Sequence, residues 1–173
     1  MRKVIIRLAL VLLMFALVYG IWWFSPYHQV RSFLASTEIN APADRVWQLL
    51  TDFNSYPYWN PYMRVEGQAR QGEKVRITLG QDSNAVSYTA RIRVVQANRQ
   101  MRWTRRVVLP GILDREQRFE LEALDATHTR LTQSERFSGI LVVPMWKNIA
   151  LVDNARGYRE MNNALKARAE TQD

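Results

Sequence analysis

The chain has 173 residues, of which 47% are hydrophobic, which is enough for one domain with its own core and a short appendage. It has no cysteine and only two histidines, so disulfides, thiolate nucleophiles, iron–sulfur clusters and cysteine zinc sites are excluded, and little is left for a metal site or a catalytic triad. The formal net charge is +8, but the first 35 residues carry four bases and no acid, and no run of bases is dense enough to indicate a nucleic-acid partner.

Residues 1–27 are predicted to form an N-terminal transmembrane signal anchor. Three bases among the first seven residues precede 17 uncharged ones, Leu8 to Phe24, which as a helix cover roughly 26 Å of the ~30 Å hydrocarbon core. A cleaved signal peptide and a buried helix are the alternatives, but the sequence "YGIWWF" is bulky where a signal peptidase requires small side chains. Because the bases precede the span, the N-terminus is predicted to be cytoplasmic.

Residues 28–35 are predicted to be a linker, and residues 36–170 a single domain. The domain begins with a short strand, "STEIN", and a helix, "APADRVWQLLTDF", whose apolar residues share one face. In the following stretch, "YPYWNPYMRVEG", Pro57 and Pro61 disfavour both a long helix and a central strand. Its four rings are therefore expected either to plug the end of the core or to border a cavity.

Alternating hydrophobic residues predict a run of antiparallel strands in the rest of the domain. Val75, Ile77 and Leu79 share one face of a first strand, and the opposite faces of this strand and the next two carry arginines. These arginines are expected to be solvated, with docking on anionic headgroups as the alternative. Two further strands, about Leu113 to Leu124 and Thr129 to Phe137, flank the turn-like sequence "DATH".

The chain ends in a helical pattern from about Val143 to Ala169, in which Gly157 allows close approach to whatever the helix covers. The order of the predicted elements is a strand, short helices, a long run of antiparallel strands and one long helix. This order predicts an α+β fold in which a curved antiparallel sheet wraps the C-terminal helix.

The hairpin around "DATH" also predicts a buried ion pair. If Phe119 points inward, the period of two sends Arg115 and Gln117 inward as well. Pairing Leu121 with Leu131 then places Gln117 opposite Glu135 and Arg115 diagonally from it. Because an ionised glutamate inside a sheet is costly unless it is paired, Arg115 and Glu135 are expected to form a charge-assisted hydrogen bond.

These elements resemble the START/Bet v 1-like (SRPBCC) superfamily, in particular its polyketide cyclase/dehydrase-like branch of small bacterial proteins. The resemblance is carried by "INAPADRVWQLLTDFNSYPYWNPYMRVEG", Trp103, "TRLTQSERFSGIL" and "MNNALKARAE", which together span nearly all of residues 36–170. It implies a helix-grip fold, in which a seven-stranded antiparallel sheet curls round the C-terminal helix and leaves an apolar tunnel. The chain departs from the branch at "REQ", residues 115–117, where many relatives have a "GEH"-like motif with a histidine able to exchange a proton near neutral pH.

The resemblance and the strand pattern together give a set of candidate ligand-binding residues, with filled core or a structural polar network as the alternative for each. No catalytic residue is assigned; Arg115 and Glu135 are the candidates if there is catalysis, and no metal site or cofactor is expected. The candidate ligand-binding residues are Trp59, Tyr62, Tyr88, Trp103, Arg115, Gln117, Phe119 and Glu135.

The function expected from the sequence is that of a membrane-tethered binding or carrier protein for a hydrophobic small molecule such as a lipid, quinone or polyketide-like compound. Enzymatic activity is less expected because the histidine is missing; a cyclase/dehydratase-like enzyme and a non-catalytic protein-interaction module with a filled core are the alternatives. The expected location is the bacterial inner membrane, with a single span and the domain on the periplasmic side. The oligomeric state and the ligand's identity are left open.

Overall fold

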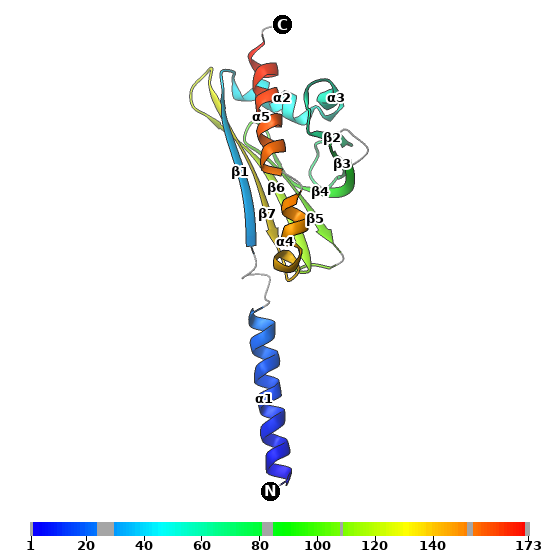
Figure 1. Ribbon diagram of the computed structural model, residues 1–173. Helices are drawn as coiled ribbons and strands as arrows, with labels where there is room; N and C mark the ends of the chain where they lie inside the picture. The colour runs from blue at the N-terminus through cyan, green and yellow to red at the C-terminus, as the bar shows by residue number, and fades with distance from the viewer. Residues whose placement is uncertain (1, 24–29, 81–84, 108, 152–153, 172–173) are drawn as a thin grey trace.

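The computed structural model describes residues 2–23, 30–80, 85–107, 109–151 and 154–171. It contains a long N-terminal helix and a curved sheet with further helices on one face (Figure 1). The helices are α1 (Arg2–Trp23), α2 (Ala43–Thr51), the 3-10 helix η2 (Phe53–Ser55), α3 (Tyr56–Trp59), α4 (Val142–Leu151) and α5 (Asn154–Glu170). The strands are β1 (Val30–Ile39), β2 (Met63–Glu66), β3 (Lys74–Leu79), β4 (Val86–Gln96), β5 (Gln100–Val107), β6 (Leu113–Ala123) and β7 (Thr129–Ser138).

The strands form one antiparallel sheet in the order β1-β7-β6-β5-β4-β3-β2. Strands β2 to β7 lie side by side in chain order, and β1 completes the sheet by pairing with β7. The predicted α+β helix-grip architecture, with seven antiparallel strands around a C-terminal helix, is therefore confirmed.

Strand β1 begins earlier than the sequence analysis placed it. It runs from Val30 to Ile39, and each of its residues has a register partner on β7. The predicted linker, residues 28–35, is therefore wrong for residues 30–35, and residues 28–29 lie outside the described part of the chain. The period-two signal was weak here because the apolar Leu34 lies on the exposed face, between Phe33 and Ala35 of the inner face.

The inner face of the sheet follows the predicted period of two, with one interruption. Val75, Ile77 and Leu79 are buried on β3, as expected. On β4 the register with β5 shifts between Ile92 and Val94, which is the signature of a β-bulge. In a regular strand Val94 would share the inner face with Ile92, but because of the bulge it is only half-buried.

The C-terminal pattern predicted as one helix from Val143 to Ala169 is described as two helices, α4 and α5, and residues 152–153 between them lie outside the described residues. Helix α5 packs along β1 and against α2, on the buried face of the sheet (Figure 1). Its buried face is marked by spacings of three and four residues, which are those of an amphipathic helix. The apolar residues on this face are Tyr158, Met161, Leu165 and Ala169.

The ring-rich stretch after α2 takes the short, broken path that its prolines predict. It forms η2 and then a single helical turn, α3, with Pro57 in the first turn. The rings separate: Tyr56 is fully buried and donates its hydroxyl to the Leu50 carbonyl at 2.6 Å, whereas Tyr58 is 90% exposed. Trp59 is half-buried and Tyr62 is buried. These rings therefore close one end of the core.

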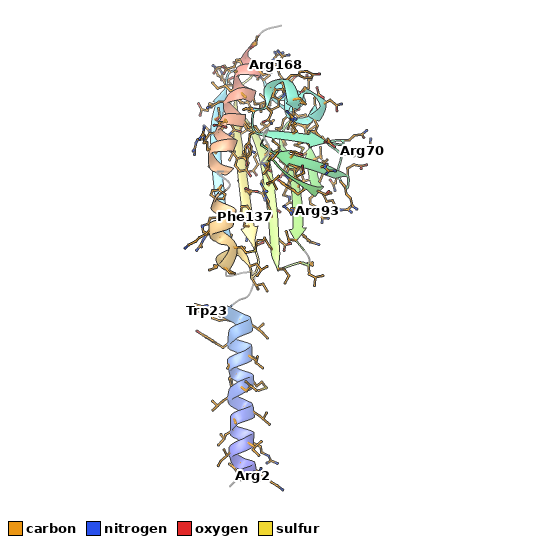
Figure 2. All side chains as sticks on the ribbon, turned by 45° about the vertical axis from the view of Figure 1, so that its right-hand side comes forward. Arg2, Trp23, Arg70, Arg93, Phe137 and Arg168 are labelled. Atoms are coloured by element: carbon orange, nitrogen blue, oxygen red, sulfur yellow. The ribbon has the colours of Figure 1, made fainter. Side chains whose placement is uncertain are left out.

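Helix α1 is long and apolar enough to cross a membrane, by its length and composition. Its 22 residues extend over roughly 33 Å, which matches the hydrocarbon thickness of a bilayer. None of its side chains is buried, and Figure 2 shows them projecting on all sides between Arg2 and Trp23. Residues 24–27 of the predicted anchor lie outside the described residues.

Gly157 lies where the first described turn of α5 meets the ring of Tyr62. A Cβ atom built on Gly157 would lie 2.1 Å from Cε2 of Tyr62. The ring of Tyr62 in turn packs edge-on against Tyr158, with centroids 5.6 Å apart. The predicted close approach at Gly157 is confirmed, and it brings α5 against the segment that follows α3.

Replacing Gly157 with alanine is expected to destabilise the protein, although alanine has the higher helix propensity. The gain in propensity is about 1 kcal/mol, and the displacement of a buried ring typically costs about 1–3 kcal/mol. The decisive comparison is the same substitution in a Tyr62→Ala background, where the clash is gone and Gly157→Ala becomes stabilising. Urea denaturation of the four proteins measures the coupling, and an equal effect of Gly157→Ala in both backgrounds would contradict the contact.

Candidate functional site

A layer of polar side chains divides the interior of the fold into two apolar parts. The main core contains Trp103 and Phe119, and a smaller cluster under α4 contains Leu113 and Phe137. Between the two, the inner faces of β6 and β7 carry polar residues instead of apolar ones. These are Arg115 and Gln117 on β6, and Gln133 and Glu135 on β7.

Arg115, Glu135 and Tyr158 form the centre of this layer and are here called the Arg–Glu–Tyr cluster. The Arg115 guanidinium donates through Nε to Oε1 of Glu135. The Tyr158 hydroxyl donates to the other carboxylate oxygen, Oε2, at 2.5 Å, and accepts a hydrogen bond from Nη2 of Arg115 at 3.3 Å. Both carboxylate oxygens are thus satisfied, which is what a buried carboxylate requires.

The hairpin places this cluster as the sequence predicts. In the β6–β7 ladder Leu121 pairs with Leu131 and Gln117 pairs with Glu135. Arg115 is two residues further along β6 and reaches diagonally to Glu135. The predicted hydrogen bond between Arg115 and Glu135 is therefore confirmed.

The cluster is almost sealed from solvent. The Glu135 side chain is 0% exposed and the Arg115 side chain is 12% exposed. Burial raises the pKa of Tyr158 well above its usual range, so this hydroxyl stays protonated and acts as a donor to Glu135. An ion pair this deep is costly to desolvate, and it persists because each partner has further polar contacts.

Tyr88 extends the polar layer toward β4. Its ring faces two guanidinium groups, with Cζ of Arg115 4.8 Å and Cζ of Arg105 4.7 Å from the ring centroid. Both are cation–π distances. Burial raises the pKa of Tyr88, so its hydroxyl is also protonated, yet this hydroxyl has no hydrogen-bond partner among the described residues.

Gln117 is another buried group of this layer with unused hydrogen-bonding capacity. Its Oε1 accepts the indole N–H of Trp103 at 3.0 Å, which fixes the amide orientation. Its Nε2 group then points away from that bond and has no partner within the described part of the chain. Tyr88 and Gln117 therefore offer two buried donors in this polar layer, one of them on a ring that faces Arg115.

The other predicted site residues lie in the main core. Trp103 is 2% exposed and packs edge-on against Phe119, with ring centroids 5.0 Å apart. Trp59 lies on the α3 side, where its indole N–H donates to the Ser55 hydroxyl at 3.1 Å and its ring packs against Tyr56. The structure therefore gathers Tyr62, Tyr88, Arg115 and Glu135 around Tyr158. Gln117 is bonded to Trp103, which lies with Phe119 deeper in the apolar core.

Tyr158 was missed by the sequence analysis. Its signal was present, because Tyr158 precedes Met161 and Leu165 by three and seven residues and follows the singled-out Gly157 directly. A tyrosine at a core-facing helix position needs a hydrogen-bond partner. The predicted inward-facing Arg115 and Glu135 were the partners available, but which turn of the helix lies over them cannot be read from the period alone.

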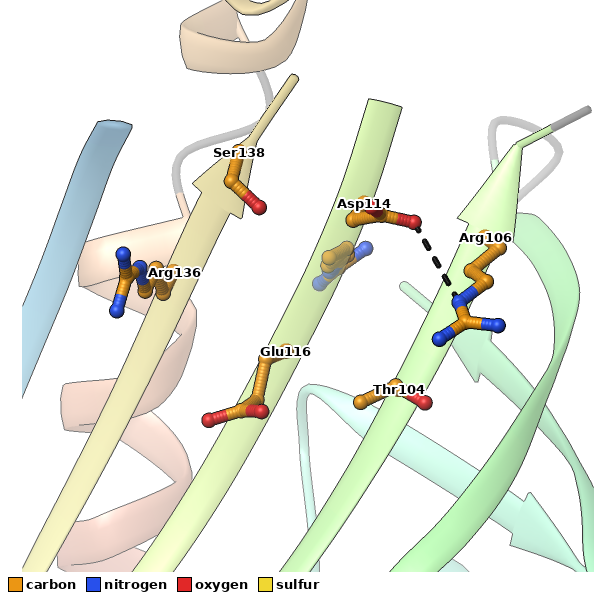
Figure 3. Close-up of a pocket in the computed structure, with 7 residues that line it drawn as sticks. Thr104, Arg106, Asp114, Glu116, Arg136 and Ser138 are labelled. Atoms are coloured by element: carbon orange, nitrogen blue, oxygen red, sulfur yellow. Dashed lines mark ion pairs between the residues drawn. The ribbon is translucent and has the colours of Figure 1, made fainter. Parts of the chain in front are cut away.

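Hollows lined by described residues lie on the outer face of the sheet and beside α2. Figure 3 shows one of about 230 Å³, where residues of β5, β6 and β7 lie side by side and Arg106 forms an ion pair with Asp114 at 3.8 Å. A neighbouring hollow of about 240 Å³ is lined by five cationic residues and no acid. A third lies between α2 and the end of α5. None of these three lies between the sheet and α5, so the apolar cavity stays a prediction.

Raising the pH above about 10 is expected to destabilise the protein in part through Tyr158. A tyrosine of the unfolded chain ionises near pH 10, whereas burial raises the pKa of Tyr158 in the folded chain. The unfolded state therefore loses a proton that the folded state keeps, and the free energy of unfolding falls as the pH rises through this range. Urea denaturation between roughly pH 8 and pH 12 should show a shallower fall for Tyr158→Phe than for the wild type. Tyr58→Phe, at a 90% exposed position, is the matched control, and identical slopes for both variants would contradict the account.

Comparisons with known proteins agree on the fold. The model of the family described as polyketide cyclase/dehydrase and lipid transport matches residues 31–170. None of the curated proteins matches the chain. Among solved structures, the Zhui aromatase/cyclase of Streptomyces sp. R1128 is similar with a TM-score of 0.65 and 22% identity, over 82% of this chain and 94% of the other.

Two further solved structures are similar at comparable coverage. A START superfamily protein of Mycobacterium smegmatis has a TM-score of 0.60 and 21% identity, over 80% of this chain and 97% of its own. A norcoclaurine synthase of Thalictrum flavum has a TM-score of 0.60 and 10% identity, over 81% of this chain and 94% of its own. At these identities the structural similarities establish the fold alone.

Proposed function

Because the chain belongs to the polyketide cyclase/dehydrase and lipid transport family, we propose that it is a membrane-tethered binding protein for a hydrophobic small molecule that carries an acceptor oxygen. The guest, of the lipid, quinone or polyketide-like class, lies between the sheet and α5. Its polar head meets the polar layer and its apolar body meets the core side chains. Tyr62 and Trp59 border the apolar part, and Trp103 and Phe119 form the packed core behind it.

The observation that carries this proposal is the pair of unused buried donors beside a buried cation. The Tyr88 hydroxyl and Gln117 Nε2 lack partners among the described residues. The Tyr88 ring faces the Arg115 guanidinium, and Gln117 is two residues from Arg115 on the inner face of β6. An unsatisfied buried polar group typically costs about 1–3 kcal/mol. A carbonyl, quinone or ester oxygen in this place would accept from these donors and recover that cost. A purely hydrocarbon guest would not.

The Arg–Glu–Tyr cluster holds these groups in place. Glu135 and Tyr158 fix the guanidinium of Arg115, and that guanidinium lies over the ring of Tyr88. Such fixed polar groups in an apolar surrounding give orientation and selectivity to a ligand site. Arg115 then polarises the ligand oxygen without any proton being transferred.

Binding, and not turnover, is the function that this chemistry supports. Burial raises the pKa of both Tyr88 and Tyr158, so neither is a base near neutral pH. Glu135 has both oxygens engaged by Arg115 and Tyr158. At the position where many relatives have a histidine the chain has Gln117, which has no proton to exchange. A cyclase- or dehydratase-like reaction would need a proton acceptor that these residues do not supply.

The anchor completes the proposal. Helix α1 is long and apolar enough to span a bilayer, and the bases before it favour a cytoplasmic N-terminus. The domain then lies on the periplasmic side of a bacterial inner membrane. Tethering keeps the domain beside the phase in which an apolar ligand dissolves, which raises the effective concentration of the encounter.

The proposal is tested with a matched pair of ligands. A short-chain quinone and the ring hydrocarbon of the same size without carbonyl groups are titrated calorimetrically into the full chain in lipid nanodiscs, with empty nanodiscs subtracted. One recovered hydrogen bond predicts a preference of about tenfold or more for the quinone. Gln117→Leu and Tyr88→Phe should bring this ratio toward one, and Tyr58→Phe should leave it unchanged. Equal affinities, or no saturable binding of either compound, would overturn the proposal.

A further inference from the structure

Strand β1 is the first strand after α1, and the end of the sheet where β1 starts also contains one end each of β5, β6 and β7. Val30, where β1 starts, pairs with Ser138 at the end of β7. Ser138 also pairs with Asp114 near the start of β6, and β5 ends beside β6. Figure 1 shows this end of the sheet, together with α4, on the side toward α1.

Two segments at this end form one hydrogen-bonded unit, here called the tip and defined as residues 109–112 and 139–144. Ile140 N–H donates to the Gly111 carbonyl and Leu141 N–H to the Ile112 carbonyl, each at 3.0 Å. Gly139, with φ +127°, approaches so closely that a Cβ atom there would lie 2.5 Å from the Ile112 carbonyl oxygen. The tip is therefore a fixed surface and not two independent loops.

The tip exposes apolar side chains to solvent. Leu109 is 62% exposed and Val143 is 52% exposed, and both are followed by exposed prolines. Elsewhere in the described domain the large exposed apolar side chains are single and scattered: Leu34, Tyr58, Val86 and Leu124. A small apolar patch on two backbone-linked segments is the kind of surface that enters the interfacial layer of a membrane.

Basic side chains surround this patch. Arg106 precedes the tip on β5, and Lys147 follows Val143 by one helical turn on α4; Arg31 and Arg136 lie at the same end of β1 and β7. All four are exposed. The acids next to these bases are engaged. The Asp114 carboxylate accepts the Gly111 N–H at 2.8 Å and pairs with Arg106, and Glu116, which faces Arg136 across the ladder, pairs with Arg102 and Arg118. Neither residues 105–112 nor residues 139–147 contain an acid. The charge of this end therefore complements anionic headgroups.

We propose that the tip docks on the surface of the membrane that α1 crosses, with Leu109 and Val143 in the interfacial layer and the four basic residues on anionic headgroups. Seven chain steps join Trp23 to Val30, which limits their separation to roughly 25 Å, so the tip lies within reach of the surface. In this orientation the small apolar cluster under α4 faces the lipid, and the Arg–Glu–Tyr cluster lies behind it. The inference rests on the proposed anchoring by α1 and not on the ligand.

Because the chain has no cysteine, a single introduced cysteine can be labelled cleanly. An environment-sensitive fluorophore is placed at Val143→Cys in the full chain, in nanodiscs of phosphatidylcholine and phosphatidylglycerol that contain a headgroup-level lipid quencher. Ala126→Cys is the matched control, because the β6–β7 turn lies at the opposite end of the hairpin from Asp114 and Ser138. A third label, at Leu12→Cys, reports insertion of α1.

We expect the label at position 143 to be blue-shifted and quenched by lipid, and the label at 126 to stay aqueous. Combining Arg106→Gln with Lys147→Gln, or omitting phosphatidylglycerol, should weaken quenching at 143 several-fold. If the label at position 143 stays aqueous while the label at position 12 is inserted in the bilayer, the docking is overturned and the anchoring by α1 is not. Shielding at 143 without lipid quenching would show a protein contact instead, and an aqueous signal at 12 would overturn the anchoring on which the inference rests.

Discussion

Replacing Glu135 with alanine is expected to lower the free energy of unfolding by about 3–5 kcal/mol, because it leaves the Arg115 guanidinium buried without its counter-ion. The Tyr158 hydroxyl loses its acceptor at the same time. The effect is measured by urea denaturation of the full chain in detergent, followed by near-ultraviolet circular dichroism of the domain.

The control for Glu135→Ala is Glu122→Ala on the neighbouring strand. Glu122 also pairs with an arginine, Arg130, at 2.8 Å, but both side chains are well exposed. Exposed pairs contribute at most about 1 kcal/mol. Restoring neutrality in the interior with Arg115→Met and Glu135→Leu together should recover much of the loss, since apolar replacements of buried pairs are often tolerated. Similar costs for Glu135→Ala and Glu122→Ala would contradict the buried pair.

The second large effect is expected for Trp103→Ala, at about 3–5 kcal/mol of lost stability. Trp103 is fully enclosed against Phe119 and Phe53, with centroid distances of 5.0 and 6.3 Å. The truncation leaves a void and also removes the donor to Gln117 Oε1. Tyr58→Ala, at a 90% exposed ring, is the control and should change stability by no more than about 0.5 kcal/mol.

The size of the Trp103→Ala effect also shows whether this ring is packed in the core or lies at the wall of a cavity. In a packed core the void costs the full amount, whereas at the wall of an open cavity a truncation removes few contacts. A loss below about 1 kcal/mol would therefore contradict the packing and would place Trp103 at a cavity wall.

The hairpin was the best predicted part of the molecule because strong local rules fix it. The period of two and the turn at "DATH" determine which residues of β6 and β7 face each other, and the pairing of Gln117 with Glu135 follows. The cost of a buried charge then requires a partner, and Arg115 was the one in reach. Sequence and physical chemistry together were sufficient for this ion pair.

The wrong or missing predictions concern structural features that the hydrophobic periodicity of the sequence does not reveal. The bulge after Ile92 adds a residue to β4 and turns Val94 partly outward. Strand β1 starts at Val30 because it pairs with β7, not because its own sequence is strongly alternating. Tyr158 reaches the polar layer because Gly157 lets α5 approach Tyr62, and helix placement of this kind depends on tertiary contacts.

The most direct test of the central claim is native mass spectrometry of the full chain, extracted in mild detergent and also after incubation with liposomes that contain quinones and phospholipids. The account predicts a one-to-one complex with an apolar molecule that bears a carbonyl or ester oxygen, and loss of this complex in Gln117→Leu with Tyr88→Phe. A chain that carries no guest under either condition, while remaining folded, would contradict the account.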